Sequence, residues 1–178
     1  MINAPETLET ARLRLRKPVP KDAEVIFRQY AQDTEVTKFL TWQPHGTIET
    51  TREFVRHCLE DWKQGKSFHW IIIGKSDNQL MGMISARVDS HKINLGYGLA
   101  RGYWGKGYMP EAIQGLIEWA LKQPEIYRVW AVCDVDNSAS ARVLEKVGMR
   151  REGLLHRWSV HPNVSAEPRD SFCYSITK

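Results

Sequence analysis

The chain has 178 residues, of which 42% are hydrophobic and 26% charged, a balance typical of one globular domain spanning residues 1–178. Its formal net charge of +4 is spread along the chain, which argues against a nucleic-acid-binding protein, whose basic residues form denser patches. No apolar run approaches the length of a membrane span and the first residues do not resemble a secretion signal, so we expect a cytoplasmic protein that does not bind membranes.

The first third of the sequence predicts one strand and two helices. Residues 8–19 alternate leucine with arginine, which is typical of a strand, and two prolines close it. We expect Asp22 to cap the first helix. A second helix is expected to begin at Thr47, to carry one apolar side and to end at Gly65.

Residues 32–46 connect these helices and are expected to form a loop that is rich in bulky side chains, including Phe39, Leu40 and Trp42. Large aromatic side chains serve both cores and binding sites, so two interpretations stay open. Either these residues pack in the core, or Phe39 and Trp42 line a pocket for substrate.

The remaining sequence predicts further strands interspersed with helices. Residues 68–74 and 80–88 are expected to form a hairpin around a Ser-Asp-Asn turn. We expect strands over residues 93–99, 127–132, 149–160 and 171–176, and helices beginning near Met109 and after Asn137. The pattern indicates the α+β class in α/β/α layers, with four helices and a mixed, mostly antiparallel sheet of about six to seven strands.

Cysteine and histidine spacing gives no sign of a metal site. Cys58, Cys133 and Cys173 are widely spaced in apolar-rich segments, so we expect reduced thiols. His156 and His161 are the nearest candidate pair and lack the spacing of zinc ligands, so no metal is expected.

A glycine-punctuated loop joins the strand over residues 93–99 to the helix that follows. Gly102, Gly105 and Gly107 leave room for a ligand to touch the main chain, and the helix begins with open N–H groups that favour phosphate. The glycine spacing matches neither the nucleotide triphosphate loop nor the dinucleotide fingerprint. The alternative is a plain glycine-rich connection in which Lys106 is solvated.

The string Trp104-Gly105-Lys106-Gly107-Tyr108-Met109, followed by Pro-Glu-Ala, resembles the pyrophosphate-binding loop of the GNAT superfamily of acetyl-CoA-dependent N-acetyltransferases. More narrowly, it is similar to the RimJ/RimL-type ribosomal-protein N-acetyltransferases. The superfamily pattern is Gln/Arg-x-x-Gly-x-Gly/Ala. Here Trp104 replaces the first residue of that pattern and Met109 the last.

A second segment, from Asn137 to Met149, resembles the GNAT helix that lies against the pantetheine arm of coenzyme A (CoA). Many superfamily members carry in this helix a tyrosine that protonates the departing thiolate, and Leu144 occupies that position here. The Rim-type branch offers a serine one turn into the helix, and Ser140 takes that place. Ser140 is therefore a candidate general acid, and a plain surface hydroxyl is the alternative.

The resemblance implies that acetyl-CoA is the cosubstrate. The main-chain N–H of Leu99 would polarise the thioester carbonyl, and a bulge at Gly96 or Gly98 would splay the central strand from the strand over residues 127–132. The residues that the resemblance assigns to acetyl-CoA are Leu99, Ala100, Trp104, Gly105, Lys106, Gly107, Tyr108, Met109, Asn137, Ser140 and Arg142.

The general base is not fixed by the sequence. Relatives often carry a glutamate where this chain has Asn94, and an amide cannot accept the proton. Catalysis through ordered water is an open alternative. The candidate side chains are Glu111, Asp134, Asp136, His69, His156 and Asp170.

The expected function is transfer of an acetyl group from acetyl-CoA to a primary amine, either a protein N-terminus or a small molecule, by direct attack. The alternative is a non-catalytic acyl-CoA-binding or sensing module of the same fold. The expected partners are acetyl-CoA and the amine acceptor, with no nucleic acid and no membrane, and the protein is expected to be a monomer or a homodimer.

Overall fold

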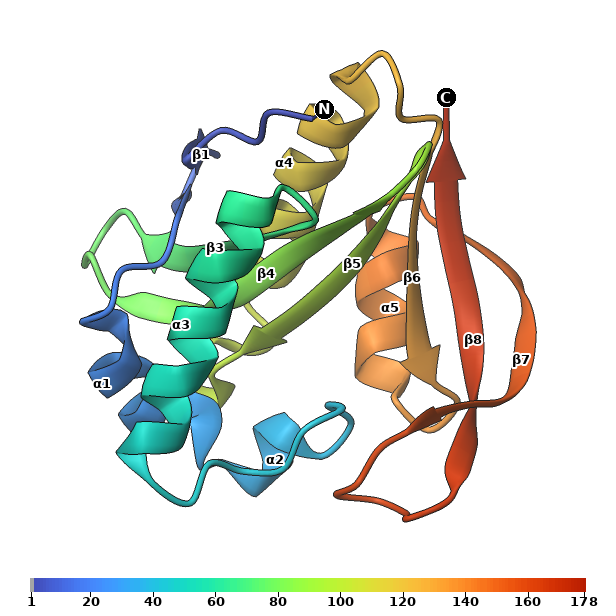
Figure 1. Cartoon of the computed structure of the whole chain (residues 1–178). Helices are drawn as coiled ribbons and strands as arrows, with labels where there is room; N and C mark the ends of the chain where they lie inside the picture. Colours follow the sequence, from blue (N-terminus) through green and yellow to red (C-terminus); the bar gives the residue numbers. More distant parts are fainter. Residues whose placement is uncertain (1) are drawn as a thin grey trace.

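The computed structural model describes residues 2–178 and contains an eight-stranded sheet with helices on both faces (Figure 1). The strands lie in the order β1-β2-β3-β4-β5-β6-β8-β7, and every neighbouring pair is antiparallel except β5 with β6. The expected mixed, mostly antiparallel sheet is confirmed. The strands are β1 (Thr7–Glu9), β2 (Leu13–Arg16), β3 (Ser67–Gly74), β4 (Leu80–Asp89), β5 (Lys92–Leu99), β6 (Arg128–Asp134), β7 (Arg150–Val160) and β8 (Pro168–Thr177).

The sheet has one strand more than the predicted maximum because residues 8–19 do not form a single strand. A turn separates β1 from β2, which pair with each other in an antiparallel hairpin. The Thr10 amide donates to the Leu13 carbonyl oxygen (2.9 Å), and the Leu13 amide donates to Thr10 Oγ1 (3.0 Å). The leucine–arginine alternation predicted the strand conformation correctly but did not reveal this turn.

The helices form the two outer layers of the predicted α/β/α arrangement. Trp70 and Ile72 of β3 pack in the cluster that contains α4, whereas Ile71 and Ile73 pack in the cluster that contains α1 and α3. None of the helices in residues 2–178 is long and apolar enough to cross a membrane. The helices are α1 (Asp22–Ile26), the π-helical turn η1 (Phe27–Ala31), α2 (Thr34–Thr37), α3 (Ile48–Gln64), the 3-10 turn η2 (Arg101–Tyr103), α4 (Tyr108–Lys122) and α5 (Ser138–Lys146).

The helix boundaries correct two expectations and confirm two. The segment 32–46 is not all loop, because it contains the short helix α2. Asp22 is the first residue of α1 and not its cap; its buried carboxylate accepts from the Val19 amide (2.8 Å) and pairs with Arg16 (2.7 Å). Thr47 caps α3, and Gly65 ends it in the left-handed conformation (φ 67°).

The central strands β5 and β6 separate along their length. They pair only at Lys92–Asn94 of β5, while β5 continues to Leu99 and β6 to Asp134. β5 stays in register with β4 throughout, so the predicted bulge at Gly96 or Gly98 is wrong. Each strand follows its fully paired antiparallel neighbour, β4 or β8, and the twist of the sheet then carries the two halves apart.

A substitution at Gly82 of β4 tests how closely β4 and β5 pack beside the gap. A Cβ atom at this position would lie 2.2 Å from the Gly98 carbonyl oxygen and 2.9 Å from the Leu99 Cα, so Gly82→Ala must displace β5. We expect the substitution to lower the free energy of unfolding by roughly 1–3 kcal/mol in urea denaturation.

The matched control is Gly153→Ala on β7, where an added Cβ meets no atom within 4 Å. We expect that change to stay within about 0.5 kcal/mol. Equal urea midpoints for the two variants would contradict the close approach of β4 and β5.

Candidate active site

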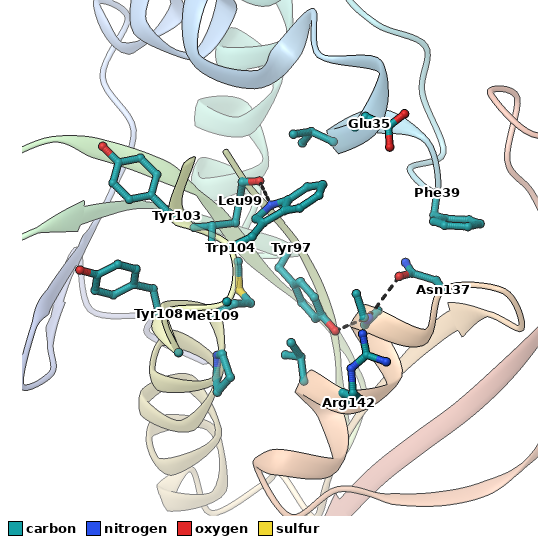
Figure 2. A pocket seen from close by; sticks show the side chains of 18 of the residues that line it. Glu35, Phe39, Tyr97, Leu99, Tyr103, Trp104, Tyr108, Met109, Asn137 and Arg142 are labelled. Atoms are coloured by element: carbon teal, nitrogen blue, oxygen red, sulfur yellow. Dashed lines mark hydrogen bonds between the residues drawn. The ribbon is translucent and has the colours of Figure 1, made fainter. Parts of the chain in front are cut away.

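A cavity of about 590 Å³ lies where β5 and β6 part, and it is lined by residues of α2, β5, the following loop, α4 and α5. Figure 2 shows two ends of this cavity, with Tyr103 and Tyr108 on one side, and Glu35 and Phe39 on the other. Tyr97 lies between them. One end is therefore built from the glycine loop, and the opposite end from the segment that follows η1.

The open edge of β5 directs main-chain groups into the gap. The Ala100 amide donates to the Met81 carbonyl oxygen (2.8 Å) on the β4 side. Because amides alternate in direction along a strand, the Leu99 N–H points away from β4 and towards the gap. The Leu99 carbonyl oxygen accepts from Trp104 Nε1 (2.7 Å), which fixes the indole at the cavity wall.

The glycine loop exposes the amino end of α4. Gly105 (φ 72°) and Gly107 (φ 78°) adopt the left-handed conformation, which places Gly107 as the residue before the helix. No side chain of the described residues caps α4, so the N–H groups of its first turn remain open to an anion. Gly102 lies in η2 without a positive φ.

The Lys106 side chain does not line the cavity. Its Nζ donates to the Gly102 carbonyl oxygen (2.8 Å) and lies 5.8 Å from the centre of the Tyr103 ring. The cations that line the cavity on α5 are Arg142 and Lys146, one helical turn apart. Positive charge for an anionic ligand therefore comes from α5 in addition to the loop amides.

Arg12 supports the glycine loop from the turn between β1 and β2. Its Nη1 donates to the Lys106 carbonyl oxygen (3.0 Å), its Nε donates to Glu111 (2.6 Å), and its guanidinium lies 4.6 Å from the centre of the Tyr108 ring. The Arg12 amide and Thr10 Oγ1 also donate to Glu111, at 2.7 and 2.6 Å.

Partial burial opposes ionisation of Glu111, but the hydrogen bonds from Thr10 and Arg12 outweigh it and lower the pKa of the carboxyl. Glu111 is therefore a charged anchor for the loop at neutral pH, and its carboxylate oxygens already accept hydrogen bonds from Thr10 and Arg12. We assign it a structural role in place of the predicted role as a candidate base.

A hydroxyl pair lies between the two ends of the cavity. Tyr97 of β5 places its hydroxyl 2.7 Å from Ser140 Oγ on α5, and Asn137 Oδ1 caps the helix by accepting from the Ser140 amide (3.1 Å). Burial raises the pKa of Tyr97 above its usual value and the pKa of Cys133 to about 11, so both groups are protonated at neutral pH.

The end of the cavity that faces α2 contains one of the two predicted aromatic residues. Phe39 lines the cavity, but Trp42 lies outside it and packs against His45 and Phe54, with ring centroids 4.7 and 6.1 Å away. Asn163 Nδ2 donates to the carbonyl oxygens of Thr37 (2.7 Å) and Trp42 (2.8 Å), which ties the turn after β7 to this wall.

The other predicted candidate bases are engaged elsewhere. Arg169 pairs with Asp134 and Asp136, Asp170 accepts from His156 (3.0 Å), and His69 contacts Asp61 (3.1 Å). Asn94 donates to the Trp130 carbonyl oxygen (3.4 Å). Within residues 2–178, Glu35 is the carboxylate that lines the cavity, and no cluster of three or more His, Cys, Asp or Glu residues could hold a metal ion.

Residues 12–150 match the family model described as an acetyltransferase (GNAT) domain, which covers more than half of the chain. The chain belongs to the GNAT acetyltransferase family. GNAT acetyltransferases use acetyl-CoA as their cosubstrate, and one structural neighbour, the microcin C7 self-immunity acetyltransferase MccE, was solved in complex with acetyl-CoA and AMP. That structure is 25% identical, has a TM-score of 0.85, and the match covers 94% of this chain and 93% of MccE.

Two curated relatives extend over nearly the whole GNAT chain. An uncharacterized N-acetyltransferase, p20 from Bacillus licheniformis, is 31% identical over 176 residues, which is 97% of each chain. The [ribosomal protein uS5]-alanine N-acetyltransferase of Escherichia coli (strain K12) is 26% identical, and the match covers 98% of this chain and 93% of that protein. The resemblance to ribosomal-protein N-acetyltransferases is confirmed.

Most of the residues assigned to acetyl-CoA from the sequence lie together in this GNAT protein. Ala100 is buried and does not line the cavity, and the exposed Lys106 side chain does not line it either. Tyr97 falls within the predicted strand over residues 93–99 and was not among the expected site residues, although a tyrosine hydroxyl needs a hydrogen-bond partner when it is buried. The cavity brings together Phe39, Leu99, Trp104, Gly105, Gly107, Tyr108, Met109, Asn137, Ser140 and Arg142.

Arg12→Ala tests the support of the GNAT loop. We expect the variant to raise the Kd of CoA about tenfold, equivalent to ~1.4 kcal/mol, because the loop amides lose the contact that holds them in place. The measurement is isothermal titration calorimetry with CoA.

Arg14→Ala is the matched control, because Arg14 is the next arginine along the chain, on β2. Its guanidinium donates a hydrogen bond to Asn78 Oδ1 (2.7 Å) and not to the glycine loop. Its CoA affinity should equal that of the wild type. An equal loss of affinity in both variants would show a general charge effect and contradict a specific role for Arg12.

Proposed function

We propose that residues 1–178 form one N-acetyltransferase domain that transfers the acetyl group of acetyl-CoA to a primary amine in a ternary complex. The observation that carries this proposal is the gap between β5 and β6, which opens directly beside the uncapped amino end of α4. An anion site and an open strand edge in one cavity fit a long ligand with a diphosphate and an amide-containing arm.

In this proposal, the main-chain amides of residues 105–109 bind the diphosphate, and Arg142 and Lys146 add positive charge. The pantetheine arm lies along the open edge of β5, where it reaches the Leu99 N–H. That N–H hydrogen-bonds to the thioester carbonyl oxygen and stabilises the negative charge that develops on it during attack.

Ser140 is proposed to protonate the departing thiolate. The amine nitrogen forms a bond to the acetyl carbon, the carbon–sulfur bond breaks, and the sulfur takes the Ser140 proton. A phenol is a stronger acid than an aliphatic hydroxyl, so Tyr97 donates to Ser140 Oγ and returns a proton to it. The proton that the amine nitrogen loses as it becomes an amide nitrogen passes to the Tyr97 oxygen, so the hydroxyl pair ends the cycle protonated. Both hydroxyls lie on the α5 side of the gap.

Glu35 and Phe39 are proposed to receive the acceptor at the far end of the cavity. A carboxylate beside an aromatic ring attracts an ammonium group, which suits a protein N-terminus or a small-molecule amine. The similarity to the uS5-alanine N-acetyltransferase supports a protein N-terminus as the first class to test.

A second candidate function is a non-catalytic acyl-CoA-binding module. It is favoured because this chain lacks an acid or base side chain at two positions where relatives often carry one. Asn94 is held by the Trp130 carbonyl oxygen, and Leu144 is fully buried. Tight CoA binding without turnover of any amine would support the module over the enzyme.

The test is thiol release from acetyl-CoA with a panel of N-terminal peptides, amino acids, polyamines and aminoglycosides. We expect release that depends on an amine, and Ser140→Ala should lower kcat by roughly 10²-fold while the Kd of CoA changes less than about threefold. Loss of the acid slows the chemical step without removing the diphosphate contacts.

The matched control is Ser138→Ala, because Ser138 is exposed on the same helix and does not line the cavity. Its turnover should equal that of the wild type. Unchanged turnover in Ser140→Ala would remove Ser140 from the mechanism.

A further inference from the structure

Three buried polar atoms near the carboxyl end of β6 have no hydrogen-bond partner in the described chain. They are both ring nitrogens of His161 and the Ser171 hydroxyl. His161 is 6% exposed and Ser171 is fully buried. Buried polar groups in native proteins are nearly always paired, with ordered water where no protein group is available. These unpartnered atoms therefore mark a small buried polar site.

Asp134 is the charged centre of this site. Ser171 lies opposite Asp134 in the β6–β8 ladder, so the two side chains share one face of the sheet, and His161 Nε2 lies 3.9 Å from Asp134 Oδ2. Burial opposes ionisation of Asp134, but hydrogen bonds from Arg169 and the Asp136 amide outweigh it and lower the pKa of the carboxyl.

Few charged groups surround the imidazole. Asp134 faces it from β6, and Arg169 of β8 binds Asp134 from the other side (2.6 Å). On the third side the ring packs edge-on against Phe39, over which Lys38 lies at 5.4 Å. The charged groups placed around the ring are therefore Asp134, Arg169 and Lys38.

The site adjoins the acceptor end of the cavity. Phe39 lines the cavity on one side and packs against His161 on the other, with ring centroids 6.5 Å apart. Successive residues of a strand point to opposite faces, so Cys133 packs in the cluster that contains Leu144 of α5, whereas Asp134 faces His161. In the proposed acetyl transfer, the end of β6 thus separates a group beside the departing thiolate from a group beside the incoming amine.

We propose that His161 accepts, through ordered water held by Ser171, the proton that the acceptor ammonium loses before attack, with Asp134 as its positioning residue. This inference rests on the proposed acetyl transfer. The ammonium gives one proton to the water, the water gives one to a ring nitrogen, and the imidazolium forms beside Asp134. The free amine then attacks the thioester, and the imidazolium releases its proton to solvent, so one proton is released per turnover.

The experiment compares His161→Gln with the wild type by thiol release from pH 6 to 9, together with CoA affinity and thermal unfolding. We expect kcat/KM to fall at least roughly 10²-fold, with an unchanged Kd for CoA and loss of the rise in rate with pH on the acidic side. His156→Gln is the matched control, because His156 is exposed on the edge strand β7, where it pairs with Asp170 of β8. The dependence of its rate on pH should match that of the wild type.

Ser171→Ala provides a second variant of small volume change in case the glutamine variant unfolds. It removes the hydroxyl that holds the water, so kcat should fall about tenfold with unchanged CoA affinity. If the wild type is active and either variant keeps kcat/KM within about threefold of it across the pH range, the role of His161 is overturned while the proposed acetyl transfer stands. Absence of turnover in the wild type with every amine would overturn the acetyl transfer and, with it, this role.

Discussion

Three residue pairs join β5 to β6, and beyond Asn94 the two strands follow different partners. β5 remains with β4 and β6 remains with β8, so neither half of the sheet can close the gap without breaking its own ladder. The strand edge that this leaves open carries the Leu99 N–H. A cleft maintained by the sheet itself is rigid, and a rigid cleft positions reactants more accurately than a mobile loop does.

The ends of the cavity depend on contacts that come from outside the central strands. Arg12 and Glu111 fix the glycine loop at one end, and Asn163 ties the α2 wall to the turn after β7 at the other. The turn between β1 and β2 and the turn after β7 thus support the two ends of a cleft that β5 lines. This arrangement lets the acceptor wall vary in sequence without disturbing the diphosphate site.

Local patterns predicted the parts of the protein whose conformation depends on neighbouring residues. The positive φ angles of Gly105 and Gly107 and the Asn137 cap were accessible because glycine and asparagine have specific backbone preferences. α2 was missed because four residues are too short to show a helical period. The Tyr97–Ser140 contact was also inaccessible, because it joins positions 43 residues apart that only the folded sheet brings together.

The most direct measurement is a crystal structure of the protein with CoA bound. The account predicts diphosphate oxygens within hydrogen-bond distance of the amides of residues 105–109, and a pantetheine arm that runs along β5 to Leu99 with its sulfur beside Ser140. A carrier bound outside the gap between β5 and β6, or a diphosphate away from the amino end of α4, would contradict it.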